Sequence, residues 1–277
     1  MSDLVLLTGA TGFVGRQVLK TFADLRRPLR VIVREGKETE LINQEGIESI
    51  ISTANLFAES AEWWTTVCKG VDTVIHLAWY TEPNKYLQSE LNIDCLVGTL
   101  QLAKGAINAG VRRFVGIGTC FEYNLQGGYL SINTPLLPLT PYAACKAAAF
   151  MTLSQLLLQK RIEFAWCRLF YLYGDGEDSR RLVPYLHACL SNGEKAELTS
   201  GNQVRDYLDV VVAGQMLVSV ALSNIKGAVN ICSGTPITVR ELAESIADRY
   251  GRRDLLLFGA RPDGVFDPPF VVGVRAE

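Results

Sequence analysis

The feature that most constrains this chain is a glycine-rich turn between its first apolar strand pattern and its first helical pattern. Leu4–Leu7 is a short continuous apolar run, typical of a strand buried on both faces. The segment Thr8-Gly-Ala-Thr-Gly-Phe-Val-Gly15 follows, and a helical pattern then runs from about Arg16 to Leu25. A strand, a glycine turn and a helix in this order predict a dinucleotide-binding unit at the carboxyl edge of a parallel sheet.

Each glycine of this turn has a physical task. Gly9 permits the tight turn, Gly12 lets the backbone approach a pyrophosphate, and Gly15 lets the helix pack closely on the strand. The helix N-terminus offers free N–H groups and the positive end of its dipole to the phosphates. The alternative is a glycine-rich turn that holds no ligand. We expect the dinucleotide to contact Gly9, Thr11, Gly12, Phe13, Val14 and Gly15.

Strand and helix patterns alternate through most of the chain. The further strand patterns cover residues 29–33, 47–51, 73–77, 114–117 and 164–169. The helical patterns cover residues 63–68, 91–109 and 141–159. Alternation at this spacing predicts an α/β fold with a Rossmann-type doubly wound parallel sheet.

The regular alternation of strand and helix patterns ends at about Gly174. Helical patterns at 182–190, 211–222 and 240–250 are separated by short strand patterns at 196–198 and 228–231. The last helix has a plausible N-cap in Thr238, with Glu241 three positions on. We assign residues 1–172 to a dinucleotide-binding domain and residues 173–277 to a small C-terminal α/β substrate lobe that is not independent. This assignment allows some earlier segments to return to the sheet or to leave it.

Composition excludes several classes of protein. The 277 residues carry a net charge of −2, which gives no long-range attraction to nucleic acid or an anionic membrane. Seven cysteines without a CxxC pair argue against a disulfide framework and a metal site. The start of the chain lacks a signal-peptide pattern, and no apolar run has the length of a membrane-spanning helix. We therefore expect a metal-free cytoplasmic protein. His76 lies in an apolar strand pattern and is expected to be a core residue.

The end of the second strand pattern indicates which dinucleotide is bound. An NAD site commonly places Asp or Glu about 20 residues after the turn, where it binds the ribose 2′-OH. Arg34 stands at that place, with Glu35 behind it. A guanidinium suits a 2′-phosphate, so we favour NADP(H) as the cofactor. The alternative is NAD(H), with Glu35 on the ribose and Arg34 in solvent.

Tyr142 and Lys146 form a candidate acid–base pair near the start of the long helix. Thr140 is a suitable N-cap and Pro141 a suitable first-turn residue, so the helix begins just before Tyr142. Residues four apart share a helix face, and an ammonium near a phenol favours the phenolate. We expect Lys146 to lower the pKa of Tyr142 from about 10 and make it a general acid/base. We expect the Thr119 hydroxyl to hydrogen-bond the substrate oxygen; the alternative is a hydrogen bond to a nearby backbone group.

With these motifs in this order, the sequence resembles the extended short-chain dehydrogenase/reductase family, of the NAD-dependent epimerase/dehydratase type that modifies nucleotide sugars. The resemblance runs from Leu4 to about Asp263. Besides the segments above, its carriers are His76-Leu-Ala78, Asn92 with Gly98-Thr99, Arg168–Gly174, Gly201–Tyr207 and Asn230–Gly234.

The resemblance implies roles at matching positions. Thr119, Tyr142 and Lys146 match the family's catalytic residues, and Tyr142 and Lys146 also contact the cofactor. Asn55 stands where the family carries an Asp near the adenine. The remaining cofactor-binding positions are Leu56, Leu77 and Ala78.

The resemblance also implies substrate contacts and a partner. Arg205 matches an arginine that binds the nucleotide diphosphate, and Arg261 is expected to act likewise; the alternative for both is a surface ion pair. Trp79 borders the nicotinamide pocket or packs structurally. Tyr171 replaces the usual Asn beside the substrate. Relatives often form homodimers through the helices that match residues 91–109 and 141–159.

Departures from the family pattern decide the subclass. Related 4,6-dehydratases carry an Asp-Glu pair directly after the catalytic Thr, and here Cys120 and Phe121 stand there. A buried, inert Cys120 is favoured over a reactive one. The working hypothesis is NADPH-dependent reduction of the 4-keto group of a nucleotide-diphosphate deoxysugar, with the proton from Tyr142. The alternatives are an NAD-dependent nucleotide-sugar 4-epimerase, a small-ketone reductase and a non-catalytic dinucleotide-sensing protein. The aromatic Tyr171 in place of the usual Asn is compatible with the small-ketone reductase.

Overall fold

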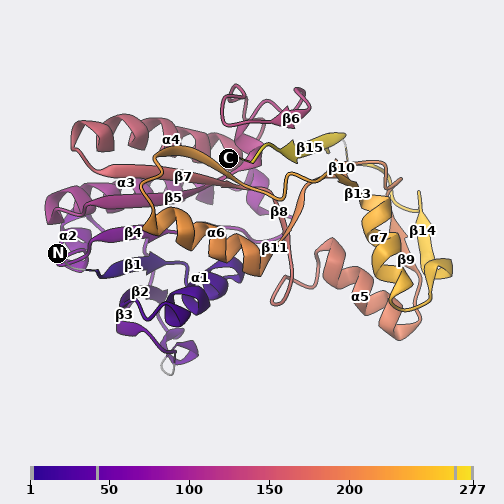
Figure 1. Ribbon diagram of the computed structural model, residues 1–277, viewed down its shortest axis with the longest axis horizontal. Coiled ribbons are helices and arrows are strands. Elements are labelled where there is room, and N and C mark those ends of the chain that lie inside the picture. Colours follow the sequence, from indigo (N-terminus) through magenta and orange to yellow (C-terminus); the bar gives the residue numbers. More distant parts are fainter. Residues whose placement is uncertain (1–2, 42–43, 265–266, 276–277) are drawn as a thin grey trace.

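The computed structural model describes residues 3–41, 44–264 and 267–275. Within these residues, seven parallel strands form the central sheet in the order β12-β7-β5-β4-β1-β2-β3 (Figure 1). They are β1 (Val5–Thr8), β2 (Leu29–Arg34), β3 (Ile47–Thr53), β4 (Thr73–His76), β5 (Arg113–Thr119), β7 (Glu163–Leu169) and β12 (Gly227–Ile231). The predicted doubly wound sheet is confirmed. Its strand order reverses between β1 and β4, where such sheets bind ligands.

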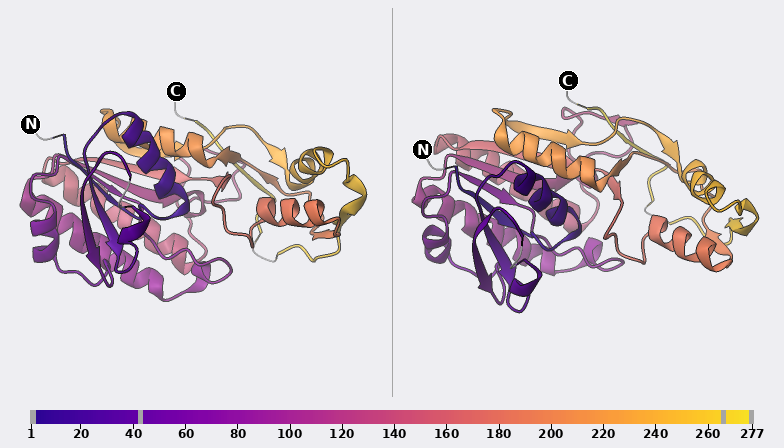
Figure 2. Two further views of the ribbon diagram at one scale, coloured as in Figure 1. Left: turned by 90° about the horizontal axis from the view of Figure 1, so that it is seen from below. Right: turned by 60° about the horizontal axis from the view of Figure 1, so that its bottom comes forward.

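Helices cover both faces of this sheet (Figure 2). One face is covered by α1 (Phe13–Asp24) and α6 (Val210–Leu222), and the other by α2 (Ala61–Val67), α3 (Leu91–Ala109) and α4 (Pro141–Gln159). Each face has its own apolar core, which removes the sheet's continuous apolar strands from water on both sides. None of the helices in the described ranges is long and apolar enough to cross a lipid bilayer.

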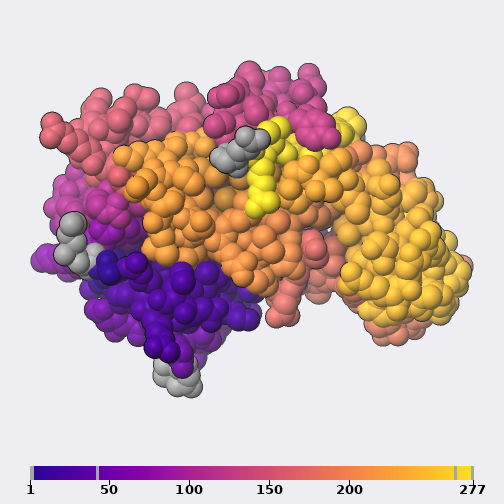
Figure 3. All heavy atoms as spheres, viewed as in Figure 1, coloured from indigo at the N-terminus to yellow at the C-terminus, as the bar shows by residue number. Residues whose placement is uncertain are grey.

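The segment that includes α6 and β12 returns to the central layers. We expected the patterns at 211–222 and 228–231 in the substrate lobe, and this placement was wrong: α6 packs on α1, and β12 extends the sheet beside β7. A Cβ on Gly214 of α6 would lie 2.7 Å from the Cβ of Gln17 in α1. In Figure 3 the orange atoms of this segment lie against the indigo N-terminal atoms. A helix this apolar must be buried on most sides, which only the sheet layers offer.

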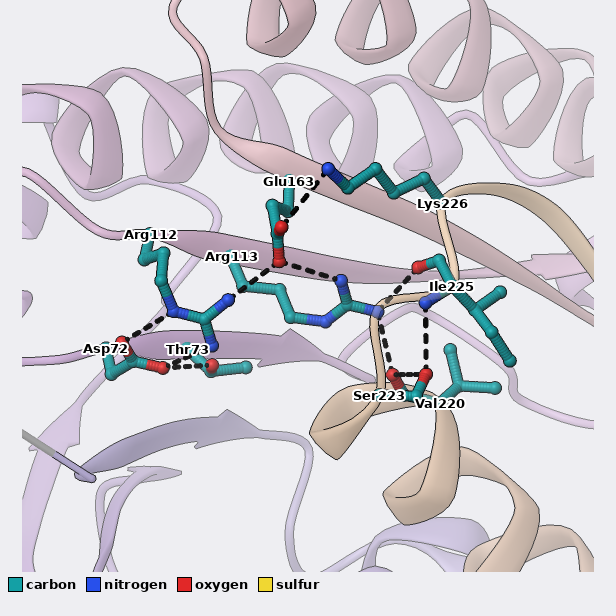
Figure 4. Close-up of polar contacts among 9 residues, drawn as sticks. All are labelled: Asp72, Thr73, Arg112, Arg113, Glu163, Val220, Ser223, Ile225 and Lys226. Atoms are coloured by element: carbon teal, nitrogen blue, oxygen red, sulfur yellow. Dashed lines mark hydrogen bonds and ion pairs between the residues drawn. The ribbon is translucent and has the colours of Figure 1, made fainter.

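Buried arginine contacts hold this returning segment at the amino ends of the strands (Figure 4). Arg113 of β5 is fully buried, and its guanidinium donates to the carbonyl oxygens of Val220 and Ile225, each at 2.7 Å. Its Nη1 also lies 3.3 Å from a carboxylate oxygen of Glu163. The neighbouring Arg112 contacts the same carboxylate at 2.7 Å from a far more exposed position. Arg113 therefore ties β5 to the connection between α6 and β12.

A small lobe stands at the carboxyl edge of the sheet, on the right in Figure 1. Its own apolar core lies between α5 (Leu182–Asn192), α7 (Val239–Asp248) and the pair β9 (Ala196–Leu198) and β14 (Leu256–Phe258). The predicted cap of α7 is confirmed, because Thr238 and Glu241 form a reciprocal capping box.

Short strands join the lobe to the sheet. One four-stranded sheet contains β13 (Ile237–Thr238), β10 (Val204–Arg205), β15 (Phe270–Gly273) and β6 (Tyr129–Leu130). A parallel pair consists of β8 (Tyr171–Tyr173) and β11 (Tyr207–Asp209). Single 3-10 turns complete the described elements: η1 (Glu38–Glu40), η2 (Tyr86–Gln88), η3 (Cys120–Glu122) and η4 (Arg253–Leu255).

Candidate active site

A cavity of about 790 Å³ opens at the carboxyl ends of the central strands. We call it the dinucleotide cleft. The predicted residues that line it are Gly9, Thr11, Gly12, Phe13, Val14, Gly15, Arg34, Leu56, Leu77, Ala78, Trp79, Thr119, Tyr142, Lys146 and Tyr171. Asn55 is not among the lining residues; its side-chain oxygen accepts a hydrogen bond from the Phe57 amide at 3.1 Å. The fold thus brings the glycine turn and the candidate catalytic residues to one cavity.

The glycine turn has the shape of a phosphate cradle. Gly9 has a φ of +73°, and a Cβ there would lie 2.8 Å from the Ala78 amide nitrogen. A Cβ on Gly15 would lie 2.0 Å from the Gly9 carbonyl oxygen. Helix α1 begins at Phe13 with Gly12 as an N-cap that offers no capping side chain. Its first N–H groups therefore have no intrahelical acceptor and suit an anionic ligand, so these residues fit a dinucleotide pyrophosphate.

The far end of the cleft is positively charged. Arg34 is exposed at the end of β2, and its guanidinium makes no hydrogen bond or ion pair with any described residue. Lys37 lines the cleft beside it, and its ammonium contacts Glu40. Glu35, the alternative ribose ligand, is not among the described lining residues. An unpaired guanidinium is suited to a phosphate, and no carboxylate from β2 opposes it.

His76 lies under the cleft floor and is a core residue, as expected. Its Nδ1 lies 2.8 Å from the Thr8 hydroxyl and its Nε2 lies 2.9 Å from the Thr99 hydroxyl. Burial, together with the smaller effect of the nearby Lys146 charge, lowers the pKa of the His76 ring to about 3. The ring is therefore neutral at physiological pH and links β1, β4 and α3.

Thr119 and Tyr142 bring two hydroxyl groups to the cleft wall. Thr119 ends β5, and Tyr142 lies in the first turn of α4, whose predicted Thr140 cap accepts a hydrogen bond from the Ala143 amide. Burial raises the pKa of the Tyr142 hydroxyl above its usual range, and a hydrogen bond with the Thr119 side chain opposes this rise only in part. Tyr142 therefore keeps its proton at neutral pH.

Lys146 does not lower the pKa of Tyr142, so that prediction was wrong. Its Nζ donates to the Ile117 carbonyl oxygen at 2.6 Å and lies 3.8 Å from the centre of the Trp79 ring. Burial lowers the pKa of the Lys146 ammonium to about 7. The two side chains share a helix face as expected, but the ammonium is directed at the strand carbonyl and the indole. Desolvation of the phenol, rather than the charge of the lysine, determines the pKa of Tyr142 and raises it.

Two aromatic residues shape the cleft around Tyr142. Trp79 contacts it edge to face with 6.5 Å between ring centres, and Tyr86 of η2 does so at 4.8 Å. Asn92 fixes both: its side chain accepts from the Trp79 indole at 2.8 Å and donates to the Tyr86 carbonyl oxygen at 2.6 Å. Sequence analysis missed Tyr86, because it lies in a loop without periodic pattern.

Glu122 anchors the backbone of Thr119. Its buried carboxylate accepts from the Thr119 amide at 2.8 Å, the Trp166 indole at 3.0 Å and the Arg168 guanidinium at 2.8 Å. These bonds fix the end of β5, where the Thr119 hydroxyl must be held. Beside it, burial raises the pKa of the Cys120 thiol to about 12, which keeps that thiol protonated and unreactive.

A second cavity, of about 320 Å³, lies toward the small lobe. We call it the lobe pocket. Its lining brings together Tyr171, Arg205 and Arg261, three of the four predicted substrate residues. Arg205 is buried and ion-paired with Asp267, so it is no surface ion pair. Arg261 is exposed and donates to the Tyr185 hydroxyl at 3.2 Å, and its Nε lies 3.9 Å from a carboxylate oxygen of the exposed Glu197, so it makes the surface ion pair that was its alternative role. Tyr171 lines both cavities and therefore stands between them.

Comparison with known proteins gives a family match. The model of the NAD dependent epimerase/dehydratase family matches residues 5–232. The dTDP-6-deoxy-L-talose 4-dehydrogenase (NAD(+)) of Aggregatibacter actinomycetemcomitans is 24% identical over 286 residues, which cover 98% of this chain and 99% of the relative. A dTDP-glucose 4,6-dehydratase of Streptomyces griseus is 26% identical over 261 residues, which cover 91% of this chain and 80% of the relative. The predicted resemblance is confirmed.

Solved structures share the fold. The UDP-N-acetylglucosamine 4-epimerase of Methanobrevibacter ruminantium, in complex with UDP-N-acetylmuramic acid, has a TM-score of 0.86 at 22% identity and covers 100% of this chain and 91% of its own. The UDP-glucose 4-epimerase of Thermus thermophilus, in complex with NAD, has a TM-score of 0.82 at 20% identity, and the match covers 98% of this chain and 90% of that structure's chain.

Proposed function

Because this chain belongs to the NAD-dependent epimerase/dehydratase family and is an enzyme of the extended short-chain dehydrogenase/reductase type, we propose that it is an NADPH-dependent reductase. Its proposed substrate is the 4-keto group of a nucleotide-diphosphate deoxysugar. One observation carries the proposal: the paired hydroxyls of Thr119 and Tyr142 line a dinucleotide cleft whose far end holds Arg34, which has no polar partner in the described part of the chain. The names of the two sequence relatives, both of which act on dTDP-linked sugars, support this substrate class.

The cofactor would lie between the glycine turn and Arg34. The N–H groups at the start of α1 would bind the pyrophosphate, and Arg34 would bind the 2′-phosphate with the help of Lys37. When bound, the dinucleotide supplies the hydride. An unpaired cation at the ribose end favours NADPH, because the phosphate of NADPH gives that charge a partner that NADH lacks.

Tyr142 would supply the proton. Reduction of a ketone needs a protonated acid beside the developing alkoxide, and burial keeps the Tyr142 hydroxyl protonated. Thr119, held by Glu122, would donate a hydrogen bond to the same oxygen. Water loss would need a further acid and base, and the positions after Thr119 hold an inert Cys120 and the hydrocarbon ring of Phe121. These side chains favour reduction over dehydration.

The lobe pocket would hold the nucleotide diphosphate of the substrate. Arg205 and Arg261 bring two guanidinium groups to this pocket, and Tyr171 and Tyr185 add aromatic surface. Guanidinium groups bind phosphate oxygens with two parallel hydrogen bonds. With the diphosphate there, the sugar would lie next to Tyr171, between the two cavities.

Cofactor binding to Arg34→Ala tests the proposal. We expect the Kd for NADPH to rise about 10- to 100-fold, as the loss of a charged hydrogen bond implies, while the Kd for NADH changes less than about twofold. Arg249→Ala, which removes an exposed arginine from the small lobe, is the matched control. Equal effects of Arg34→Ala on both dinucleotides would contradict the role of this residue.

A second measurement separates the reductase from a 4-epimerase, which would use the same hydroxyl groups. A reductase consumes one added NADPH for each sugar that it reduces. Purified protein that carries bound NAD and interconverts nucleotide sugars without added cofactor would identify an epimerase instead.

A further inference from the structure

One carboxylate oxygen in the wall of the dinucleotide cleft has no partner among the described residues. Glu177 lines the cleft, and its Oε2 is buried without a hydrogen bond. The other unpaired buried side-chain atoms of the described chain belong to Trp64, Arg113 and Arg168, none of which lines either cavity. Buried polar atoms in native proteins nearly always have a partner. An unpaired acceptor in a cleft wall therefore calls for a donor from outside the chain, which a bound ligand or an ordered water supplies.

The backbone builds this carboxylate into the wall. Gly174, directly after β8, has a φ of +138°, and a Cβ there would lie 2.8 Å from a Val210 side-chain carbon. The Glu177 amide then donates to the Gly174 carbonyl oxygen at 3.2 Å, which closes the turn. Glycine suits the first position of this turn, and the turn brings Glu177 into the lining of the cleft.

Glu177 lies where the dinucleotide cleft and the lobe pocket meet. It lines the cleft, and Tyr207, whose pKa is raised by burial and to a lesser extent by the charge of Glu177, lines the lobe pocket. Burial raises the pKa of the Glu177 carboxyl to about 7, against the opposing charge of Arg181. Tyr171, on the neighbouring strand, lines both cavities.

We infer that Glu177 is a substrate-binding residue whose free oxygen accepts a hydrogen bond from a hydroxyl group of the sugar ring. The inference rests on the proposed substrate class. With the dinucleotide on the glycine turn and the diphosphate beside Arg205, the sugar is the part of the substrate that reaches Glu177. Sugar hydroxyls are donors, whereas the oxygens of an ionised phosphate are acceptors and offer no donor to this free oxygen. Glu177 thereby selects for the sugar rather than for the nucleotide.

Calorimetric binding to NADPH-saturated protein tests this inference. The probes are dTDP and dTDP-glucose, with UDP and UDP-glucose as a second pair. In the wild type we expect each sugar nucleotide to bind more tightly than its nucleotide. In Glu177→Gln, which keeps the size of the side chain, we expect the Kd for the sugar nucleotide to rise about 10-fold or more. The Kd values for the nucleotide alone and for NADPH stay within about twofold.

Asp175→Asn is the matched control, because it removes a negative charge from the same loop at an exposed position outside both linings. It leaves every Kd unchanged. A Glu177→Gln variant that binds sugar nucleotides like the wild type overturns the inference, and so does one whose NADPH or nucleotide Kd rises as much as the sugar-nucleotide Kd. If the wild type binds none of the four probes, the proposed substrate class itself is wrong.

Discussion

Replacing Arg113 by Met should destabilise the fold far more than the same change at its neighbour Arg112. Both side chains contact Glu163, but the Arg113 side chain is 0% exposed and that of Arg112 is 46% exposed. The buried guanidinium also donates to the Val220 and Ile225 carbonyl oxygens, each at 2.7 Å. The comparison therefore isolates the contacts that hold the α6–β12 connection on the sheet.

The size of the effect follows from what each group retains. After the loss of Arg113, Val220 still accepts from the Ser223 hydroxyl at 2.9 Å, and Glu163 still pairs with Arg112. The Ile225 oxygen loses its side-chain donor in a part-buried contact, and the loss of such a donor costs about 1–3 kcal/mol. The full penalty for breaking a buried ion pair does not apply, because Glu163 is partly exposed and stays paired. We expect a loss of about 2–3 kcal/mol in the free energy of unfolding for Arg113→Met.

Arg112→Met removes the ion pairs with Asp72 and Glu163, in which the Arg112 side chain is 46% exposed, and pairs of such an exposed guanidinium are worth up to about 1 kcal/mol. Equilibrium unfolding in urea, followed by far-UV circular dichroism, measures both variants against the wild type. Equal losses in the two variants would refute the reasoning, because burial would then not decide the cost. A loss below about 0.5 kcal/mol for Arg113→Met would show that the connection is held by other contacts.

Two further predictions concern pH and assembly. The pKa of His76 is about 3 in the folded protein. Between pH 6.5 and 3, His76 is therefore protonated in the unfolded chain but neutral in the native protein. Its contribution to stability is complete above pH 6.5 and is lost, to a total on the order of 5 kcal/mol, as the pH falls through this window. In urea unfolding, His76→Gln should flatten this dependence while His187→Gln does not; equal slopes would contradict the assignment. We also propose a homodimer through α3 and α4, where Met151 is 60% exposed. Met151→Glu should yield a monomer by light scattering while Val211→Glu on α6 leaves a dimer; a wild-type monomer would contradict this interface.

Helix ends could be predicted from the sequence where local chemistry sets them. The bounds 91–109 and 141–159 are those of α3 and α4. Thr140 caps α4 with Pro141 behind it, and Gly110 ends α3 with a φ of +76°. The glycine turn was equally local, because its strand, turn and helix are contiguous. These features depend on neighbouring residues, so a single sequence contains them.

Features that depend on distant contacts could not be predicted. The placement of β12 beside β7 is a pairing between remote segments, and its short apolar run is equally compatible with the lobe. The direction of the Lys146 ammonium depends on the Ile117 carbonyl and the Trp79 ring, which come from other elements. Glu177 lies in a loop whose sequence looks like any polar turn. Its unpaired oxygen is visible only once the cleft is formed.

NADPH oxidation by Tyr142→Phe, with dTDP-4-keto-6-deoxyglucose as substrate, tests most directly that Tyr142 supplies the proton. The substitution removes only the hydroxyl group, so the Kd for NADPH should stay within about twofold of the wild type. The rate of NADPH oxidation should fall about 100-fold or more, as the loss of a general acid implies. A Tyr142→Phe variant that oxidises NADPH at the wild-type rate would contradict the proposed role of Tyr142.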